Sequence, residues 1–195
     1  MNESVISVAS LSTANESDFF SFFDGDAFSD NPEWSSCYCQ CFYEDHEKIV
    51  WKEQTAARNR QKACERLRAQ SMQGYLAYID SQPVGWCGAA PRRLLRALDD
   101  EPIPDAEQVG NIVCFLVSPS HRRQGIAKAL LDAACRGLAA QGLAIAEANP
   151  QPDAKTDAEN HVGPLSLYLA SGFEVHREDH DGSVYVRRSL LQGAS

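Results

Sequence analysis

The residues best suited to chemistry lie together in a strand, a turn and the start of a helix. There the pattern Arg122-x-x-Gly125-x-Ala127 places a glycine and a small residue where a loop becomes a helix. The first N–H groups of a helix lack partners and the helix dipole is positive there, so an anion can bind. Gly125 allows a pyrophosphate to approach the backbone, and Arg122 or Arg123 can add charged contacts. The pattern predicts a phosphate-binding loop; the alternative is an ordinary helix start with surface arginines.

The elements that must position this loop follow from the hydrophobic pattern. Asn111–Ser118 is a nearly continuous apolar run, which predicts a strand covered on both faces. Ile126–Leu138 has one apolar side and predicts a long helix, followed by a strand at Leu143–Ala148 and a short helix at Pro164–Ser171. The other expected elements include a strand at Val5–Ser12, helices within Asn15–Phe28 and Glu44–Met72, and a loop or short helix from Arg92 to Gln108. Two hairpins are also expected. One joins Gly74–Asp80 to Val84–Ala90 and turns at Ser81-Gln82-Pro83, and the other joins Phe173–Glu178 to Val184–Ser189 through a type I′ turn at Asp181-Gly182.

A second motif near the C-terminus, Leu167-Tyr168-x-x-x-Gly172-Phe173, adds context to the loop. With both motifs in this order, the chain resembles the GNAT superfamily of acyl-CoA-dependent N-acetyltransferases. The pyrophosphate signature of that family, Gln/Arg-x-x-Gly-x-Gly/Ala, matches the loop, and its frequent Leu-Tyr-x-x-x-Gly-Phe segment matches the second motif. The resemblance covers nearly the whole chain. It implies an α/β (α+β) fold with a mixed, mainly antiparallel central sheet flanked by helices, in one domain spanning residues 1–195.

The resemblance also implies a binding site for the co-substrate acetyl-CoA. In this family the cofactor lies between two central strands that separate, here Asn111–Ser118 and Leu143–Asn149, and the acceptor amine attacks the thioester directly. Acceptor-side helices are expected at about 15–72, the cofactor-binding core at about 111–149, and a C-terminal helix and hairpin at 164–190. The residues expected to bind the cofactor are Phe115, Leu116, Val117, Arg122, Arg123, Gln124, Gly125, Ile126 and Ala127.

Two residues are candidates for proton transfer. By resemblance, Tyr168 is the general acid for the CoA thiolate, and the alternative is a tyrosine packed at the end of a short helix. Glu147 interrupts an apolar strand near the expected separation, where a carboxylate could take the ammonium proton. The alternative for Glu147 is an outward-facing or hydrogen-bonded strand residue. His161 and Asn149 are weaker candidates.

The acceptor is expected to bind against residues 15–72. Nine Asp or Glu residues and no Lys or Arg lie between Asn15 and Glu47, whereas seven Lys or Arg accompany two Glu between Lys48 and Ser71. A pocket that used these carboxylates and nearby aromatics would attract a cationic amine, while a solvated acidic face is the alternative. We therefore predict a small primary amine or an amino-acid-like acceptor. The alternative acceptor is a protein lysine or N-terminus, and the alternative function is that of a non-catalytic acyl-CoA-binding protein.

Seven cysteines form an odd set, and three of them alternate as Cys37, Cys39 and Cys41. With His46 they could bind zinc or form a thiol redox sensor, but their spacing departs from structural zinc patterns. Packing is favoured, and no metal is expected. The other four are expected to be small buried hydrophobes: Cys64, Cys87, Cys114 and Cys135.

Composition limits the remaining classes of function. The chain has 195 residues and a net charge of −9, which disfavours binding to nucleic acid or anionic lipid. Its longest central apolar run, Ile112–Val117, is too short to span a bilayer, and its N-terminus lacks a basic signal region. We expect a cytoplasmic protein whose partners are acetyl-CoA and an amine acceptor, and a homodimer is left open.

Overall fold

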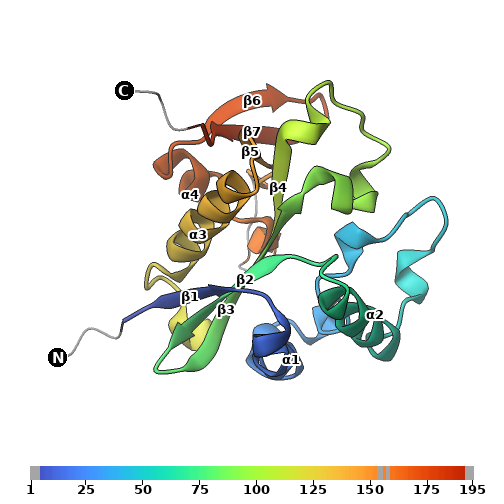
Figure 1. Cartoon of the computed structure of the whole chain (residues 1–195), viewed down its shortest axis with the longest axis vertical. Helices are drawn as coiled ribbons and strands as arrows, with labels where there is room; N and C mark the ends of the chain where they lie inside the picture. Colours follow the sequence, from blue (N-terminus) through green and yellow to red (C-terminus); the bar gives the residue numbers. More distant parts are fainter. Residues whose placement is uncertain (1–4, 153–155, 157–158, 192–195) are drawn as a thin grey trace.

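The central feature of the computed structural model is one seven-stranded sheet with the order β1-β2-β3-β4-β5-β7-β6 (Figure 1). The structure describes residues 5–152, 156 and 159–191. The strands are β1 (Ser7–Ser10), β2 (Gly74–Ile79), β3 (Gln82–Pro91), β4 (Val109–Val117), β5 (Ile145–Ala148), β6 (Glu174–Glu178) and β7 (Val184–Ser189). Only β4 and β5 pair in parallel, and the other neighbours are antiparallel. The predicted fold class is confirmed.

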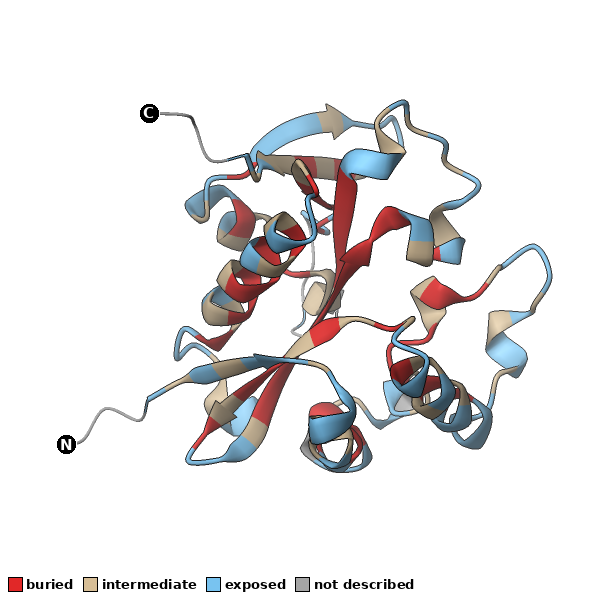
Figure 2. Cartoon of the chain, viewed as in Figure 1, coloured by how far each residue is buried: buried red, intermediate tan, exposed pale blue. Residues whose placement is uncertain are grey.

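Helices cover both faces of this sheet. They are α1 (Glu16–Asp24), α2 (Ala56–Arg68), α3 (Ile126–Ala140) and α4 (Leu165–Ala170). The apolar side of α3 packs on one face together with α4, whereas α1 and α2 lie on the other (Figure 1). Buried residues run along most of β3 and β4, which lie between these two cores (Figure 2).

The core between α1 and the sheet is rich in aromatic side chains. Four buried phenylalanines of α1 face the sheet, and the ring centroid of Phe19 lies 5.0 Å from that of Trp86 on β3. Phe23 stacks on Tyr38 with the centroids 5.8 Å apart. Because Tyr38 belongs to the segment between α1 and α2, this stacking holds that segment against the sheet.

Two turns differ from the prediction. The loop between β2 and β3 is Asp80-Ser81, and both residues have positive φ, of 49° and 65°. This two-residue loop therefore has the features of a type I′ turn, and Gln82 and Pro83 already belong to β3. At the β6–β7 hairpin the type I′ prediction is wrong: only Gly182 has positive φ, and the Gly182 N–H donates to the Asp179 carbonyl at 3.0 Å. The loop is longer than two residues, so Asp181 need not adopt a left-handed conformation.

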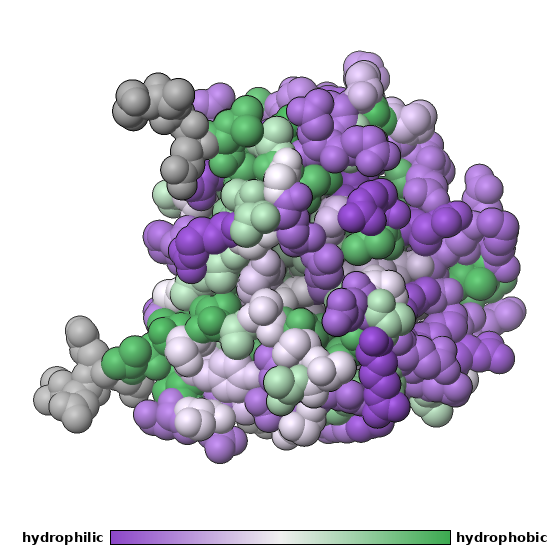
Figure 3. All heavy atoms as spheres, in the orientation of Figure 1, coloured by the Kyte–Doolittle hydropathy of each residue, from purple (hydrophilic) through white to green (hydrophobic). Residues whose placement is uncertain are grey.

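The helix expected within Glu44–Met72 is shorter than that range. It begins at Ala56, where the Thr55 hydroxyl accepts a hydrogen bond from the Arg58 N–H at 3.3 Å. In the part of this range before α2, the structure has one short 3₁₀ turn, Trp51–Glu53. Hydrophilic side chains cover the side of the molecule where α2 and this segment lie, on the right of Figure 3. No helix in the described ranges has the length and apolar character needed to cross a membrane.

The acidic and basic halves of residues 15–72 pair with one another. Their ion pairs are Glu16–Arg68 (2.9 Å), Asp24–Arg60 (3.1 Å), Glu44–Lys62 (2.8 Å), Glu44–Arg66 (2.8 Å) and Asp45–Lys48. Much of the charge that the sequence sets apart is thus neutralised within the fold.

Candidate active site

The two central strands that the GNAT resemblance implied, β4 and β5, separate after Ile112 and Ala148. Parallel pairing between β4 and β5 runs from Val109 with Ile145 to Ile112 with Ala148, where β5 ends. The strand β4 continues to Val117 with only β3 paired beside it. The other edge of β4 is therefore not paired with β5 there, and its main-chain groups can contact an extended ligand.

A β-bulge in β4 coincides with this separation. Gly88 of β3 pairs with Cys114 and Ala89 pairs with Ile112, so Val113 is the extra residue. Bulges bend a strand and often lie next to active sites. The bulge was not predicted from the sequence, although Gly88 within an apolar strand was a signal that could have indicated it.

A cavity of about 310 Å³ lies beside the free part of β4 and reaches the start of α3. Eight of the nine predicted cofactor-binding residues line it: Phe115, Leu116, Val117, Arg122, Arg123, Gly125, Ile126 and Ala127. The ninth, Gln124, instead donates its side-chain amide to the Ser120 carbonyl at 3.2 Å. The structure thus brings the strand and loop residues together around one cavity.

The loop before α3 is shaped to present backbone amides. Arg123 and Gly125 have positive φ, of 61° and 84°, on either side of Gln124. Left-handed residues of this kind help to form concave arrays of N–H groups that bind anions. A Cβ added at Gly125 would meet no atom within 4 Å, so the cavity is open at that position. The residues present therefore fit the pyrophosphate of a CoA ester.

The Arg122 side chain is already engaged. Its Nε donates to the Val117 carbonyl at 3.1 Å, and its two terminal nitrogens contact the Asp30 carboxylate at 2.5 and 3.1 Å. Hydrogen bonding from Arg122 lowers the pKa of Asp30. Arg122 thus ties the end of β4 to the segment after α1, and its predicted contact with the cofactor stays a prediction.

Comparison with known proteins identifies the family. A model of the acetyltransferase (GNAT) family matches residues 20–160. The chain belongs to the GNAT acetyltransferase family. A search of curated proteins finds no match to the sequence.

Solved structures of other acetyltransferases share the fold. An N-acetyltransferase from Staphylococcus aureus Mu50 is 14% identical, with a TM-score of 0.60 over 96% of this chain and 100% of its own. The PaiA N-acetyltransferase from Thermoplasma acidophilum, in complex with coenzyme A, is 15% identical (TM-score 0.54, 95% and 99% coverage). The ribosomal-protein-S18-alanine N-acetyltransferase from Escherichia coli is 12% identical (TM-score 0.52, 98% and 98% coverage). At these identities the likeness concerns the fold.

Tyr168 of this GNAT protein lies behind the cavity wall. Its side chain is fully buried, and its hydroxyl donates to the Val162 carbonyl at 2.7 Å. Burial raises the pKa of Tyr168 well above its usual value. The ring packs against Phe115, and a Cβ added at Gly163 would lie 3.0 Å from it, so two cavity-lining residues separate Tyr168 from the open space. Its role as general acid stays a prediction.

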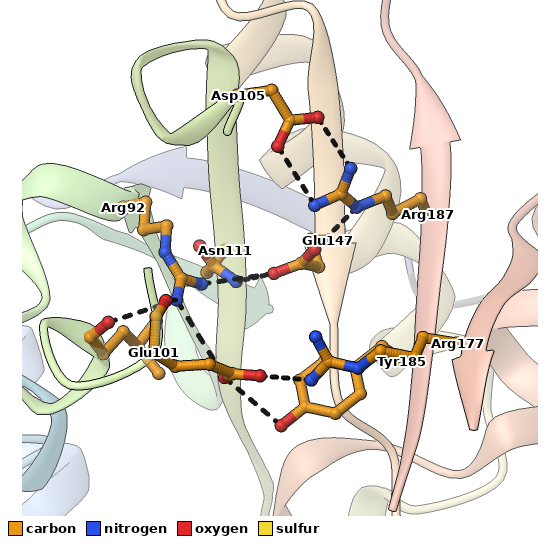
Figure 4. A network of polar contacts seen from close by, with 9 residues as sticks. Arg92, Glu101, Asp105, Asn111, Glu147, Arg177, Tyr185 and Arg187 are labelled. Carbon is orange, nitrogen blue, oxygen red and sulfur yellow. Dashed lines mark hydrogen bonds and ion pairs between the residues drawn. The ribbon is translucent and has the colours of Figure 1, made fainter. Parts of the chain in front are cut away.

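Glu147 lies in a buried polar network (Figure 4). One carboxylate oxygen accepts from Arg92 at 3.3 Å and from the Asn111 side-chain amide at 3.0 Å, and the other accepts from Arg187 at 2.6 Å. Arg187 also contacts Asp105 at 2.7 Å. The network joins β4, β5 and β7 to the segment after β3. Both oxygens of Glu147 are engaged, and its role as general base stays a prediction.

A second cavity, of about 500 Å³, adjoins the first. It is lined by Trp34, Ser36, Cys37, Cys39, Cys41, Phe42, Trp51, Lys52, Gln54, Cys114 and His161. Trp34 and His161 also line the first cavity, and their ring centroids lie 4.6 Å apart. The two cavities therefore meet at this pair of rings, and we call the second one the aromatic chamber.

The cysteine segment forms one wall of this chamber. Tyr38 and Cys39 are consecutive residues with positive φ, of 45° and 57°, a strained conformation for residues other than glycine. Cys39 packs so close to β3 that a Cβ at Gly88 would lie 2.8 Å from its sulfur. Within the described part of the chain, no group of three His, Cys, Asp or Glu is arranged to hold a metal ion.

Proposed function

We propose that this GNAT protein transfers the acetyl group of acetyl-CoA to the amine of a small molecule by direct attack. The observation that carries the proposal is the junction of two cavities where β4 and β5 separate. One cavity has an anion-binding loop and a free strand edge, which suit a CoA ester. The other, at about 500 Å³, has the size of a small-molecule pocket.

Each part of the site has a proposed task. The loop from Arg122 to Ala127 binds the pyrophosphate through main-chain N–H groups, and the free edge of β4 hydrogen-bonds the extended arm of the cofactor. Acetyl-CoA supplies an acyl thioester. A main-chain amide of β4 stabilises the oxyanion that forms when the amine attacks. Direct attack by the amine, with the oxyanion stabilised by backbone N–H groups, requires no metal ion and no acyl-enzyme intermediate.

His161 is the residue that we propose as the proton acceptor. It lines both cavities, which places it where the amine must lose a proton. An imidazole has an ordinary pKa of about 6.5 and can accept a proton near neutral pH. Replacing His161 with Gln should lower kcat about 10²-fold and flatten the acid limb of the pH–rate profile. A variant with the wild-type profile would exclude this role.

Cofactor binding is tested by calorimetry with acetyl-CoA. The protein should bind it, and Gly125→Glu should abolish binding because the carboxylate repels the pyrophosphate. Gly142→Glu is a matched control, since Gly142 has nearly the same φ of 83° and its added Cβ also meets no atom within 4 Å. Equal loss of binding in both variants would show that backbone strain, not the loop, is responsible.

Turnover is tested by following CoA thiol release with a panel of amines. The panel contains amino acids, polyamines and a lysine-containing peptide, because a protein acceptor is the second candidate from the sequence. Release with small amines supports the proposal. Binding of acetyl-CoA without release for any amine would instead indicate a non-catalytic acyl-CoA-binding protein.

A further inference from the structure

The aromatic chamber has a composition that narrows the acceptor, an inference that rests on the proposed function. Its walls contain two indole rings, from Trp34 and Trp51, and the phenyl ring of Phe42. Four thiols complete the apolar lining. Flat rings and polarisable sulfur both make favourable contacts with an aromatic or large apolar group.

Three of the four thiols in these walls have raised pKa values, which favour the neutral form. Burial raises the pKa of Cys37 to about 11 and that of Cys41 to about 12. A hydrogen bond with Cys39, together with burial, raises the pKa of Cys114. The same hydrogen bond lowers the pKa of Cys39, although Cys39 is only 3% exposed and its burial acts in the opposite direction. An amine that enters such a chamber loses solvation, which lowers its own pKa and favours the neutral form that can attack the thioester.

The described side chains that line the chamber include no counter-charge for a polycation. No Asp or Glu with a described side chain lines it, and three carboxylates of the neighbouring segments already pair with basic residues: Asp24, Glu44 and Asp45. Among the described side chains, a second ammonium group in the chamber would therefore find no carboxylate to offset its desolvation. This argues against polyamines.

One lysine contributes a positive charge at the edge of the chamber. Lys52 lines the chamber and is exposed, and within the described ranges no acidic residue pairs with it. The nearby Lys48, by contrast, pairs with Asp45 and lines a different cavity. An ammonium group at the edge of an apolar chamber is a suitable partner for a carboxylate on the bound molecule.

We infer that the acceptor is an α-amino acid with an aromatic or large apolar side chain. Its side chain packs among Trp34, Trp51 and Phe42, its carboxylate pairs with Lys52, and its amine lies beside His161 at the junction with the first cavity. The nitrogen lone pair attacks the thioester carbonyl, and the amine proton passes to His161. The bond from carbon to the CoA sulfur breaks, and the leaving thiolate takes up a proton from the His161 imidazolium. The products are the N-acetyl amino acid and CoA.

The inference is tested by binding and by turnover, with the full chain in both. Phenylalanine, phenethylamine and spermidine are titrated into the protein in the presence of CoA, and binding is followed by calorimetry. Phenethylamine keeps the ring and amine but lacks the carboxylate, and spermidine lacks the ring and adds charges. We expect affinity to fall in the order phenylalanine, phenethylamine, spermidine, and kcat/KM with acetyl-CoA to fall in the same order.

Lys52→Ala isolates the carboxylate contact. It should weaken phenylalanine binding by about three- to fivefold, the range of an exposed ion pair, and leave phenethylamine unchanged. Lys48→Ala is the control and should change neither. Tighter binding of spermidine than of phenylalanine, or equal effects of Lys52→Ala on both ring-containing amines, would overturn the inference. Each of these results would leave the proposed acetyl transfer unaffected. That proposal fails only if the protein acetylates no small amine.

Discussion

Replacing Glu147 with Gln should separate a structural role from a catalytic one. The side chain is only 4% exposed and is held by two arginines and by Asn111. The substitution removes the charge and places an amide donor opposite the N–H groups of Arg187 or Arg92. Two buried guanidinium groups are then left with less negative charge beside them. Removing one partner of a buried ion pair in this way lowers stability strongly, because the remaining charge stays buried and uncompensated.

The size of the effect follows from the partners that remain. Removing one member of a buried ion pair costs about 3–5 kcal/mol. Arg187 keeps Asp105 at 2.7 Å, and Arg92 keeps the carbonyls of Leu98 and Glu101 at 3.1 and 2.6 Å, so the lower end applies. About 3 kcal/mol corresponds to a fall in Tm of roughly 6–12 °C for a chain of this size.

The assay is thermal unfolding, read alongside kcat at several pH values. Asp132→Asn is the control, since it removes an exposed i,i+4 pair with Lys128 at 2.7 Å and should lower Tm by only about 1–2 °C. We expect Glu147→Gln to lower Tm strongly and to keep the pH dependence of kcat. A Tm within 2 °C of wild type with a shifted pH profile would refute this reasoning and assign Glu147 as the base.

Two further predictions concern Tyr168 and Glu44. Tyr168→Phe removes the hydroxyl that holds the Val162 carbonyl next to His161, so kcat should fall while the Kd for acetyl-CoA stays the same. A fall in kcat of about 10²-fold or more would indicate a general acid, and a smaller fall would indicate a positioning role. An unchanged kcat would contradict both roles. At Glu44, burial raises the pKa, but hydrogen bonds from Lys62 and Arg66 outweigh it and lower the pKa below its usual value. A lowered pKa contributes stability that is present above the unfolded pKa of about 4.3 and is lost as the pH falls through the folded value. Glu44→Gln should therefore destabilise by about 2 kcal/mol at pH 7 and much less at pH 3, and a Tm difference that stays constant with pH would contradict the assignment.

Local patterns in the sequence predicted the elements around the proposed cofactor site. The apolar run before Pro119 and the glycine before Ile126 predict a strand, a loop and a helix from short-range rules alone, and the structure has all three. Eight of the nine residues that the loop pattern and the GNAT resemblance indicated line one cavity. The remaining one, Gln124, turns back on its own loop, which residue type cannot indicate.

Long-range pairing explains what the sequence could not predict. The nine carboxylates between Asn15 and Glu47 predicted an attractive acidic surface, but the partners of Glu16 and Asp24 are arginines on α2, far along the chain. Glu147 was recognised as unusual in an apolar strand, yet its partner Arg92 comes from a segment with no recognisable pattern. Charge in one segment therefore says little about a pocket until its neighbours in space are known.

Gly88 gives the aromatic chamber a second determinant outside its walls. A methyl group at this position would lie 2.8 Å from the sulfur of Cys39, closer than atoms can pack, so the Cys39 side chain would have to rotate or the cysteine segment move away from β3. The chamber would change shape although no residue that contacts the acceptor had changed. Selection for a new acceptor should therefore find substitutions at position 88, and relatives with a larger residue there should carry a differently placed segment between α1 and α2 and accept molecules of another shape.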